Sequence, residues 1–141
     1  MRFMVIVKAS KDSEAGKLPK ESELREMGKF NEELVKAGVM LAGEGLQDSS
    51  KGARVRFEGG KRTVIDGPFA ETRELVAGFA IWEVKDMDEA VAWAKRSPNP
   101  TSGRSEIEIR PFYEAADLAE FMTPEELSAP RDGERGKLGV A

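Results

Sequence analysis

Residues 75–84 (LVAGFAIWEV) restrict the possible folds more than any other part of the sequence. An apolar run of this length, bounded by charged residues, predicts a buried β-strand. Because successive side chains of a strand point to opposite faces, Phe79 and Ile81 share one face while Ala80 and Trp82 share the other. A strand that is apolar on both faces is typical of a sheet that is covered on both sides. We therefore expect a sheet with two covered faces.

The predicted elements follow the order strand, helix, strand, hairpin, strand, helix, strand. Helical spacing of apolar residues predicts a helix over residues 19–37, with Pro19 in its first turn and Gly38 directly after its end. A second helix follows Asp86 and Glu89, which have the spacing of a capping box. Strands are predicted at residues 3–7, 39–46, 53–57, 62–65, 75–84 and 105–112. A turn at Gly59-Gly60 joins the strands at 53–57 and 62–65 into a hairpin.

This order predicts an α+β fold with the ferredoxin-like plan, βαββ(β)αβ, in which one antiparallel sheet carries both helices on the same face. Residues 9–18 are expected to form a loop. Since the helices cover one face only, the second apolar face needs another cover. A homodimer that packs sheet against sheet is the simplest way to supply it.

The last part of the chain differs from the rest, and we treat residues 114–141 as an extension. A short helix is expected at residues 117–122. Thr123 followed by Pro124 is a good N-cap with proline in the first turn of a further helix. Beyond Pro130 the sequence is polar and rich in glycine, and it is expected to fray.

Composition excludes several classes of function. The formal net charge of −4 with intermixed acids and bases argues against binding to nucleic acid or to an anionic membrane. The chain has no cysteine and no histidine, which removes disulfides, thiolate nucleophiles and the commonest metal ligands. No metal or cofactor is predicted. Since no apolar run approaches the length of a membrane-spanning helix and no signal peptide is evident, a cytoplasmic location is expected.

Residues 64–74 (VIDGPFAETRE) closely resemble the DGPFAET(K/R)E signature of the YCII-related, or DGPF-motif, family. The match continues on both sides, at residues 43–46 (GEGL), 88–94 (DEAVAWA) and 107–111 (IEIRP), and it covers roughly residues 1–113. The resemblance implies a dimeric α/β barrel built from ferredoxin-like protomers. In the family most members have no assigned activity. One branch removes chloride from aromatic rings with a His–Asp pair, and other members are encoded near extracytoplasmic-function sigma factors. Because this chain lacks histidine, the His–Asp chemistry does not transfer to it.

The motif and its surroundings supply the candidate site residues. Asp66 and Glu71 are candidates for acid/base catalysis, because two carboxylates in one cleft perturb each other's pKa. Candidates for substrate binding are Arg73, Arg56, Arg110, Glu44 and Phe69. Each has a plainer interpretation: the charged residues form solvated surface pairs, and Phe69 belongs to the core or a dimer interface. Gly67 and Pro68 are explained by turn formation alone.

Three functions remain open at this point, and the plainest is a domain whose cleft has no retained activity. The first is a small-molecule enzyme that performs elimination or isomerisation by acid/base chemistry in a cleft beside the motif. The second is a regulatory module that binds a metabolite or a protein without catalysis, for example as an accessory to a sigma factor. An enzyme would place Asp66 in a concave pocket, whereas a binding module could have it tied up in turn hydrogen bonds.

Overall fold

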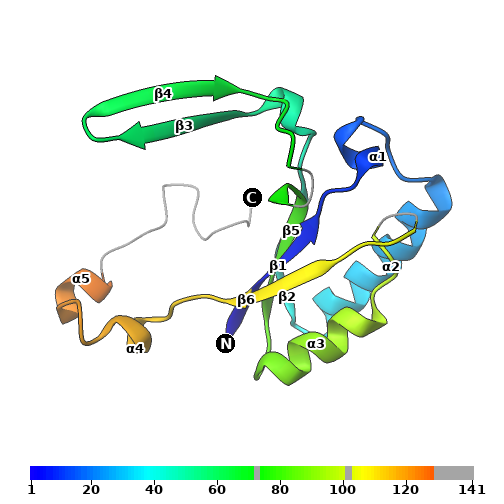
Figure 1. Cartoon of the computed structure of the whole chain (residues 1–141). Coiled ribbons are helices and arrows are strands. Elements are labelled where there is room, and N and C mark those ends of the chain that lie inside the picture. The colour runs from blue at the N-terminus through cyan, green and yellow to red at the C-terminus, as the bar shows by residue number, and fades with distance from the viewer. Residues whose placement is uncertain (72–73, 101–102, 129–141) are drawn as a thin grey trace.

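The computed structural model describes residues 1–71, 74–100 and 103–128 of the chain. Its main sheet has four antiparallel strands in the order β2-β5-β1-β6 (Figure 1). The long helices α2 and α3 lie on the same side of this sheet. The predicted α+β, ferredoxin-like fold is therefore confirmed. The bounds of these elements are Arg2–Lys8 for β1, Glu21–Lys36 for α2, Met40–Gly45 for β2, Val76–Glu83 for β5, Met87–Arg96 for α3 and Ile107–Pro111 for β6.

The hydrophobic core lies between this sheet and the two helices. Phe3 of β1 and Trp82 of β5 pack against Phe30 and Leu34 of α2, and Ala90 of α3 completes the cluster. Phe3 and Leu34 are the largest side chains that are fully buried. Complete burial of a leucine or phenylalanine side chain contributes about 1.5–3 kcal/mol. The helix-covered face of the sheet therefore fixes the positions of all four strands.

The opposite face of the sheet is also apolar. It carries Met4, Ile6, Phe79 and Ile81, because Met4 pairs with Ile81 and Ile6 pairs with Phe79. Ile81 is buried, whereas the other three side chains are half-buried. Neither α2 nor α3 covers this face (Figure 1). The two-sided apolar pattern predicted for residues 79–82 is present, with one face covered by the helices.

The helix ends agree with the sequence in part. Pro19 lies before the N-cap of α2, so the prediction that it occupies the first turn is wrong. Gly38 follows α2 with φ at 73°, the left-handed conformation that ends helices. At α3 the Asp86 carboxylate accepts the Glu89 backbone N–H at 2.9 Å, as predicted. The Glu89 carboxylate, however, accepts the backbone N–H of Lys85 rather than that of the N-cap.

A short helix, α1 (Lys11–Glu14), lies within residues 9–18, where a loop was predicted. Its start is held by two serines that cap each other. The Ser13 backbone N–H donates to the Ser10 hydroxyl at 3.1 Å, and the Ser10 N–H donates to the Ser13 hydroxyl at 2.8 Å. Because this helix buries no side chain, it has no apolar period that the sequence could reveal.

Two further strands, β3 (Ala53–Glu58) and β4 (Lys61–Asp66), form a separate two-stranded sheet that we call the hairpin. Its register pairs Val55 with Val64, as the alternating sequence predicts. Gly59 takes φ at 57° in the turn, a conformation that glycine adopts without steric cost. The hairpin projects from the main sheet on the side opposite to α2 and α3 (Figure 1).

Residues 113–126, which we call the C-terminal arm, leave the end of β6 and also extend away from the helices (Figure 1). Its first helix, α4 (Ala115–Leu118), lies earlier than the helix predicted at residues 117–122. The second, α5 (Pro124–Ser128), begins as predicted after Thr123, whose hydroxyl accepts the Glu126 N–H. The segment after Pro130 that was expected to fray lies outside the described residues.

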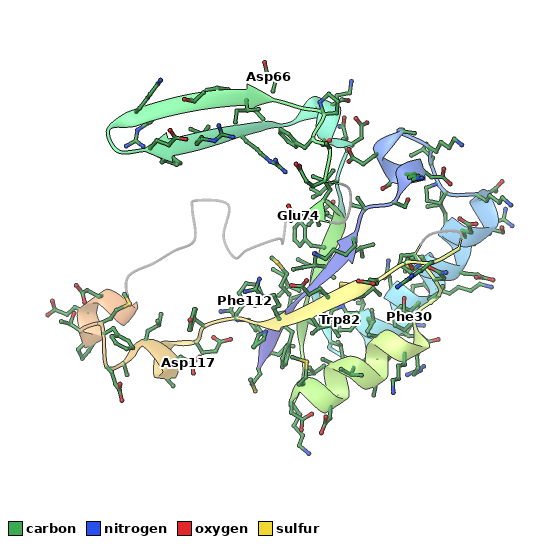
Figure 2. The ribbon with its side chains drawn as sticks, in the orientation of Figure 1. Phe30, Asp66, Glu74, Trp82, Phe112 and Asp117 are labelled. Atoms are coloured by element: carbon green, nitrogen blue, oxygen red, sulfur yellow. The ribbon has the colours of Figure 1, made fainter. Side chains whose placement is uncertain are left out.

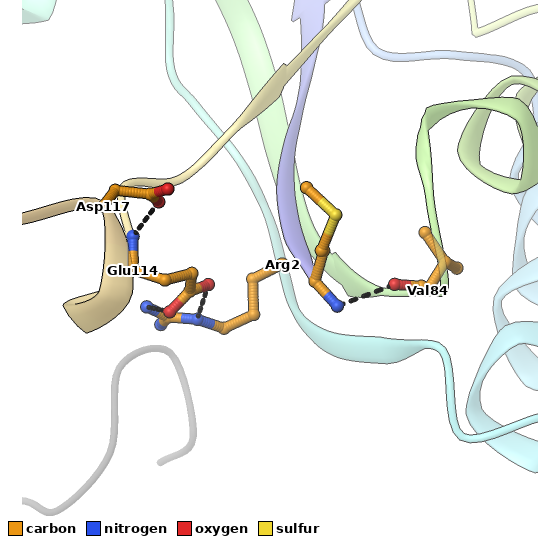
Figure 3. A network of polar contacts seen from close by, with 5 residues as sticks. Arg2, Val84, Glu114 and Asp117 are labelled. Atoms are coloured by element: carbon orange, nitrogen blue, oxygen red, sulfur yellow. Dashed lines mark hydrogen bonds and ion pairs between the residues drawn. The ribbon is translucent and has the colours of Figure 1, made fainter.

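The arm is fastened to β1 at its start. The Arg2 guanidinium donates two hydrogen bonds to the Glu114 carboxylate, at 3.1 and 3.2 Å (Figure 3). Arg2 also lies over the ring of Phe112, 5.1 Å from its centroid. The hydrogen bonds from Arg2 hold the pKa of Glu114 below its usual range. The direction in which the arm leaves the sheet is thus fixed by an ion pair.

Candidate functional site

The DGPF motif packs directly against the short 3₁₀ turn η1 (Ser49–Lys51), which precedes the hairpin. The Gly67 N–H donates to the Gly52 carbonyl at 3.0 Å. A Cβ atom at position 67 would lie only 1.8 Å from the Ser49 carbonyl oxygen. The peptide bond between Gly67 and Pro68 is cis. Glycine is thus required here because the two backbones touch.

Ser49 joins three separate segments of the chain. Its hydroxyl donates to the Glu14 carboxylate at 2.5 Å, and its backbone N–H donates to the other oxygen of the same carboxylate at 3.0 Å. The same hydroxyl accepts the Phe69 N–H at 3.0 Å. The helix α1, the turn η1 and the DGPF motif are therefore linked through one side chain, and they form one wall of a groove.

The groove is open and has a volume of about 700 Å³. The charged side chains that line it are three acids and two bases. Among the described residues, neither Lys51 nor Glu74 has an ion-pair or hydrogen-bond partner for its side chain. Apolar side chains, including the buried Leu75, line the rest. The full lining consists of Glu14, Leu46, Gln47, Asp48, Ser49, Lys51, Gly52, Arg54, Phe69, Glu74, Leu75 and Val76.

Arg54 is held flat against the motif. Its guanidinium carbon lies 3.9 Å from the centroid of the Phe69 ring, a stacked geometry that suits a cation over an aromatic face. One guanidinium nitrogen lies 3.7 Å from the Glu71 carboxylate. At this distance the pair adds little to stability, because both side chains are largely exposed. Its effect is to orient the arginine at the edge of the groove.

Asp48 is the groove acid whose ionisation is altered. The Ser50 hydroxyl and backbone N–H both donate to its carboxylate, and these hydrogen bonds lower the pKa of Asp48 below its usual range. Asp48 is half-buried. The lowered pKa keeps its carboxylate charged, so Asp48 contributes a fixed negative charge to the groove.

The structure separates most of the residues proposed from the sequence. Asp66 is exposed at the end of β4 and points outward from the hairpin, and it does not line the groove, whereas Glu74 does (Figure 2). Glu71 is exposed beside Arg54. Of the proposed binding residues that the structure describes, Phe69 alone lines the groove. Arg73 lies outside the described residues.

The remaining candidates lie on other surfaces. Arg56 is farther along the hairpin, 3.9 Å from Glu58. Glu44 pairs with Phe79 and Arg110 pairs with Met4, so both belong to the face of the main sheet that the helices leave uncovered. Arg110 is 3.8 Å from the Glu108 carboxylate. These residues do not come together with Asp66 around one cavity.

Several groove residues carry no signal in the sequence. Glu14 lies in a segment that reads as a loop, and Asp48, Ser49 and Lys51 lie between two predicted strands. Arg54 could have been proposed as a site residue from the sequence, because it lies on the same face of the hairpin as Arg56 and nearer to the base of the hairpin. Only the packing of the DGPF motif on η1 reveals which of the two arginines faces the groove.

The acids of the groove do not form a metal site. Within residues 1–71, 74–100 and 103–128, no group of three or more acidic side chains is placed to hold a metal ion. In the same ranges every helix is too short or too polar to cross a bilayer.

Comparison with known proteins places the chain in a family. An uncharacterized protein of Rhizobium meliloti (strain 1021) is 30% identical over 100 residues, which make up 70% of this chain and 81% of that protein. A dehydrochlorinase of 5-chloro-2-hydroxyhydroquinone from Burkholderia phenoliruptrix AC1100, solved with 2,5-dihydroxybenzoquinone, aligns with 81% of this chain and 95% of its own, at 14% identity and a TM-score of 0.45. The family model of the YCII-related domain matches residues 1–113. The chain therefore belongs to the YCII-related family, as its DGPF motif predicts.

Proposed function

We propose that the groove beside the DGPF motif binds a small molecule that has an anionic group and a flat apolar part. The observation that carries this proposal is a groove that holds Phe69 together with Lys51 and Glu74, two charged side chains that form no ion pair or hydrogen bond with the described residues. The Lys51 ammonium, whose charge also acts on the nearby Asp48 carboxylate, forms no ion pair with a described residue and can hold a carboxylate or a similar anion. The Phe69 ring and the Leu46 side chain supply an apolar surface against which a planar group can pack.

Glu74 would then be the base in the acid/base reaction expected from the sequence. Asp66 lies outside the groove, whereas the Glu74 carboxylate lines it and forms no ion pair or hydrogen bond with the residues that the structure describes. A ligand that displaces water from around a carboxylate makes that carboxylate a stronger base. Removal of a proton next to a carbonyl or an aromatic ring, leading to elimination or isomerisation, needs one such base and a cation that holds the substrate.

A homodimer is part of the same proposal. Met4, Ile6 and Phe79 are half-buried on the sheet face that lacks helices. Packing of this face against its equivalent in a second copy would remove these apolar side chains from water. Each Å² of apolar surface so covered contributes about 25 cal/mol. The homodimer stays a prediction. So do the cytoplasmic location and the division into a domain of residues 1–113 and an extension of residues 114–141.

The alternative is a module that binds a metabolite in the groove without turning it over. The absence of histidine favours this alternative, because the side chain that most often serves as a base at neutral pH is missing. The position of Asp66 outside the groove favours it too. Both functions share the binding site, so one experiment tests the site and a second separates the functions.

The experiment is a thermal-shift screen of the full chain with small aromatic and aliphatic carboxylates. A compound present at a hundred times its Kd should raise the Tm by roughly 5–10 °C. Lys51→Met should abolish the shift, while Asp66→Asn, outside the groove, should leave it unchanged. Absence of any shift across the panel, or equal shifts for Lys51→Met and the wild type, would refute the proposed site.

Turnover of a compound that binds is then followed by NMR. An enzyme should convert the compound or exchange one of its carbon-bound protons for deuterium, and Glu74→Gln should bind the compound without this reaction. If the wild type binds the compound and neither converts it nor exchanges a proton, the chain is a binding module and the catalytic part of the proposal fails.

A further inference from the structure

Arg54 covers one face of the Phe69 ring at the groove. Its guanidinium carbon lies 3.9 Å from the centroid of that ring, which is a distance of direct contact. No other group fits between the guanidinium and the ring at this distance. Both residues line the groove. A ligand in the groove therefore meets this face of Phe69 through Arg54 rather than directly.

The Phe69 ring is itself held by the segment that precedes the hairpin. The Phe69 N–H donates to the Ser49 hydroxyl at 3.0 Å. A Cβ atom at Gly52 would lie 4.0 Å from Cε2 of the ring, so the edge of the ring lies close to the Gly52 backbone. Phe69 is half-buried. The ring is thus a supported base on which the Arg54 side chain rests.

Much of the Arg54 side chain stays accessible although one side of it rests on the ring. The side chain is 46% exposed. Among the described residues its one ion pair is the contact of 3.7 Å between a guanidinium nitrogen and the Glu71 carboxylate, and its guanidinium donates no hydrogen bond. Arg54 therefore presents a flat cationic group that a ligand in the groove can contact.

A flat cation of this kind attracts aromatic rings more than saturated ones. A guanidinium is planar and weakly hydrated, so the face of an aromatic ring can stack on it. The attraction comes from the negative potential on the ring face, and at an accessible site it tightens binding about two-fold to five-fold. A saturated ring of the same size lacks that potential. Arg54 can therefore distinguish ligands that differ only in whether their flat part is aromatic.

We infer that Arg54 determines the specificity of the groove and selects aromatic carboxylates with an electron-rich ring. This inference rests on the proposed binding function and names the class of ligand more closely. The ring of the ligand stacks on the Arg54 guanidinium, and its carboxylate is held by Lys51, which lies three residues earlier in the chain. Phe69 acts as a positioning residue, because its ring holds the guanidinium from behind.

Titration of the full chain with phenylacetate and with cyclohexylacetate, followed by NMR, tests the stacking. The two compounds carry the same carboxylate on rings of similar size. Burial of apolar surface alone would favour the saturated ring, which has more hydrogen atoms and more apolar area. We expect phenylacetate to bind about two-fold to five-fold more tightly, because its ring can stack on a guanidinium.

Substituents on the ring of phenylacetate test the electronic part. The methylene group separates the carboxylate from the ring, so a substituent changes the ring face much more than the basicity of the carboxylate. A methoxy group, which donates electrons, should lower the Kd, and a nitro group, which withdraws them, should raise it.

Three variants assign the preference to Arg54. Arg54→Lys keeps the charge and replaces the planar group by a compact, strongly hydrated ammonium, so the preference for phenylacetate should disappear. Phe69→Leu should reduce it as well, because the guanidinium loses its support. Arg56→Lys is the matched control: Arg56 lies on the same face of the hairpin, is 3.9 Å from Glu58 and does not line the groove, so this variant should keep the wild-type preference.

The outcomes separate this inference from the proposed function. If the wild type binds neither compound, both are refuted. If Lys51→Met abolishes binding of both compounds but the wild type shows no preference for the aromatic ring, the groove stands and the role of Arg54 is wrong. The role is also wrong if Arg54→Lys weakens both compounds equally and keeps the preference, because Arg54 would then form the wall of the groove without selecting the ring.

Discussion

Replacement of Gly67 by alanine should release the base of the hairpin while the core stays intact. The added Cβ atom would lie 1.8 Å from the Ser49 carbonyl oxygen, and contacts below 3.0 Å do not occur for real Cβ atoms. The two backbones must therefore separate by more than 1 Å. This movement breaks the Gly67 N–H bond to Gly52, which is worth about 0.5–1.5 kcal/mol. Forced repacking around the site costs a further 1–3 kcal/mol, by analogy with overpacked cores.

These contributions give about 1.5–4.5 kcal/mol, which applies to local opening, since the hairpin forms its own sheet. Amide hydrogen exchange in residues 49–66 should accelerate by between roughly ten-fold and two-thousand-fold, because 1.4 kcal/mol corresponds to a factor of ten. Exchange in β5 should not change. Gly60→Ala is the matched control, because a Cβ at that position meets nothing within 4 Å. Equal exchange in the two variants would mean that the motif does not pack on η1 as described.

Two other perturbations have calculable outcomes. Leu34→Ala removes a fully buried side chain and should lower the free energy of unfolding in urea by about 2–5 kcal/mol, whereas the exposed Leu24→Ala should change it by no more than about 0.5 kcal/mol. The Arg2 ion pair lowers the pKa of Glu114 in the folded chain. The ion pair therefore contributes its full stabilisation above the ordinary carboxyl pKa of about 4.3, and this stabilisation is lost as the pH falls through the lowered pKa. Because both side chains are about one-third exposed, we expect less than about 1 kcal/mol, seen as faster exchange or proteolysis of the arm in acid. Glu114→Gln should remove this pH dependence; an arm that responds to acid equally in that variant would disprove the role of the ion pair.

The sequence contains most of the fold but little of the groove. The four strands of the main sheet and the two long helices follow from their apolar residues, because each has a face in one core, whereas the exposed hairpin follows from its alternating sequence and the Gly59-Gly60 turn. The family motif identifies where a site should be, at residues 66–69. The groove itself, however, is assembled from residues 14, 46–54, 69 and 74–76, which meet only through the contacts of Ser49 and Gly67. No pattern in the chain specifies those contacts.

Two features of the structure do not follow from hydrophobic period. Asp66 is part of the motif, but the end of β4 turns its side chain outward, and a shift of one residue along a strand reverses a face. The helix α1 depends on the caps of Ser10 and Ser13 rather than on burial, so hydrophobic period cannot detect it. Alternation along β4 sets the direction of Asp66, and local polar contacts hold α1, so the two features have to be seen in the folded chain.

The positions of tryptophan and tyrosine give the core and the C-terminal arm separate optical signals. Trp82 is buried in the core with no hydrogen-bond acceptor for its indole N–H among the described residues, and Trp93 packs near Phe30 on the helix side. These are the chain's two tryptophans, so tryptophan fluorescence reports on the helix–sheet core and does not report on the hairpin. The single tyrosine, Tyr113, stands at the start of the arm. Tyrosine emission or its NMR ring signals therefore follow the arm alone, and a spectroscopist can watch core and arm separately without adding a label.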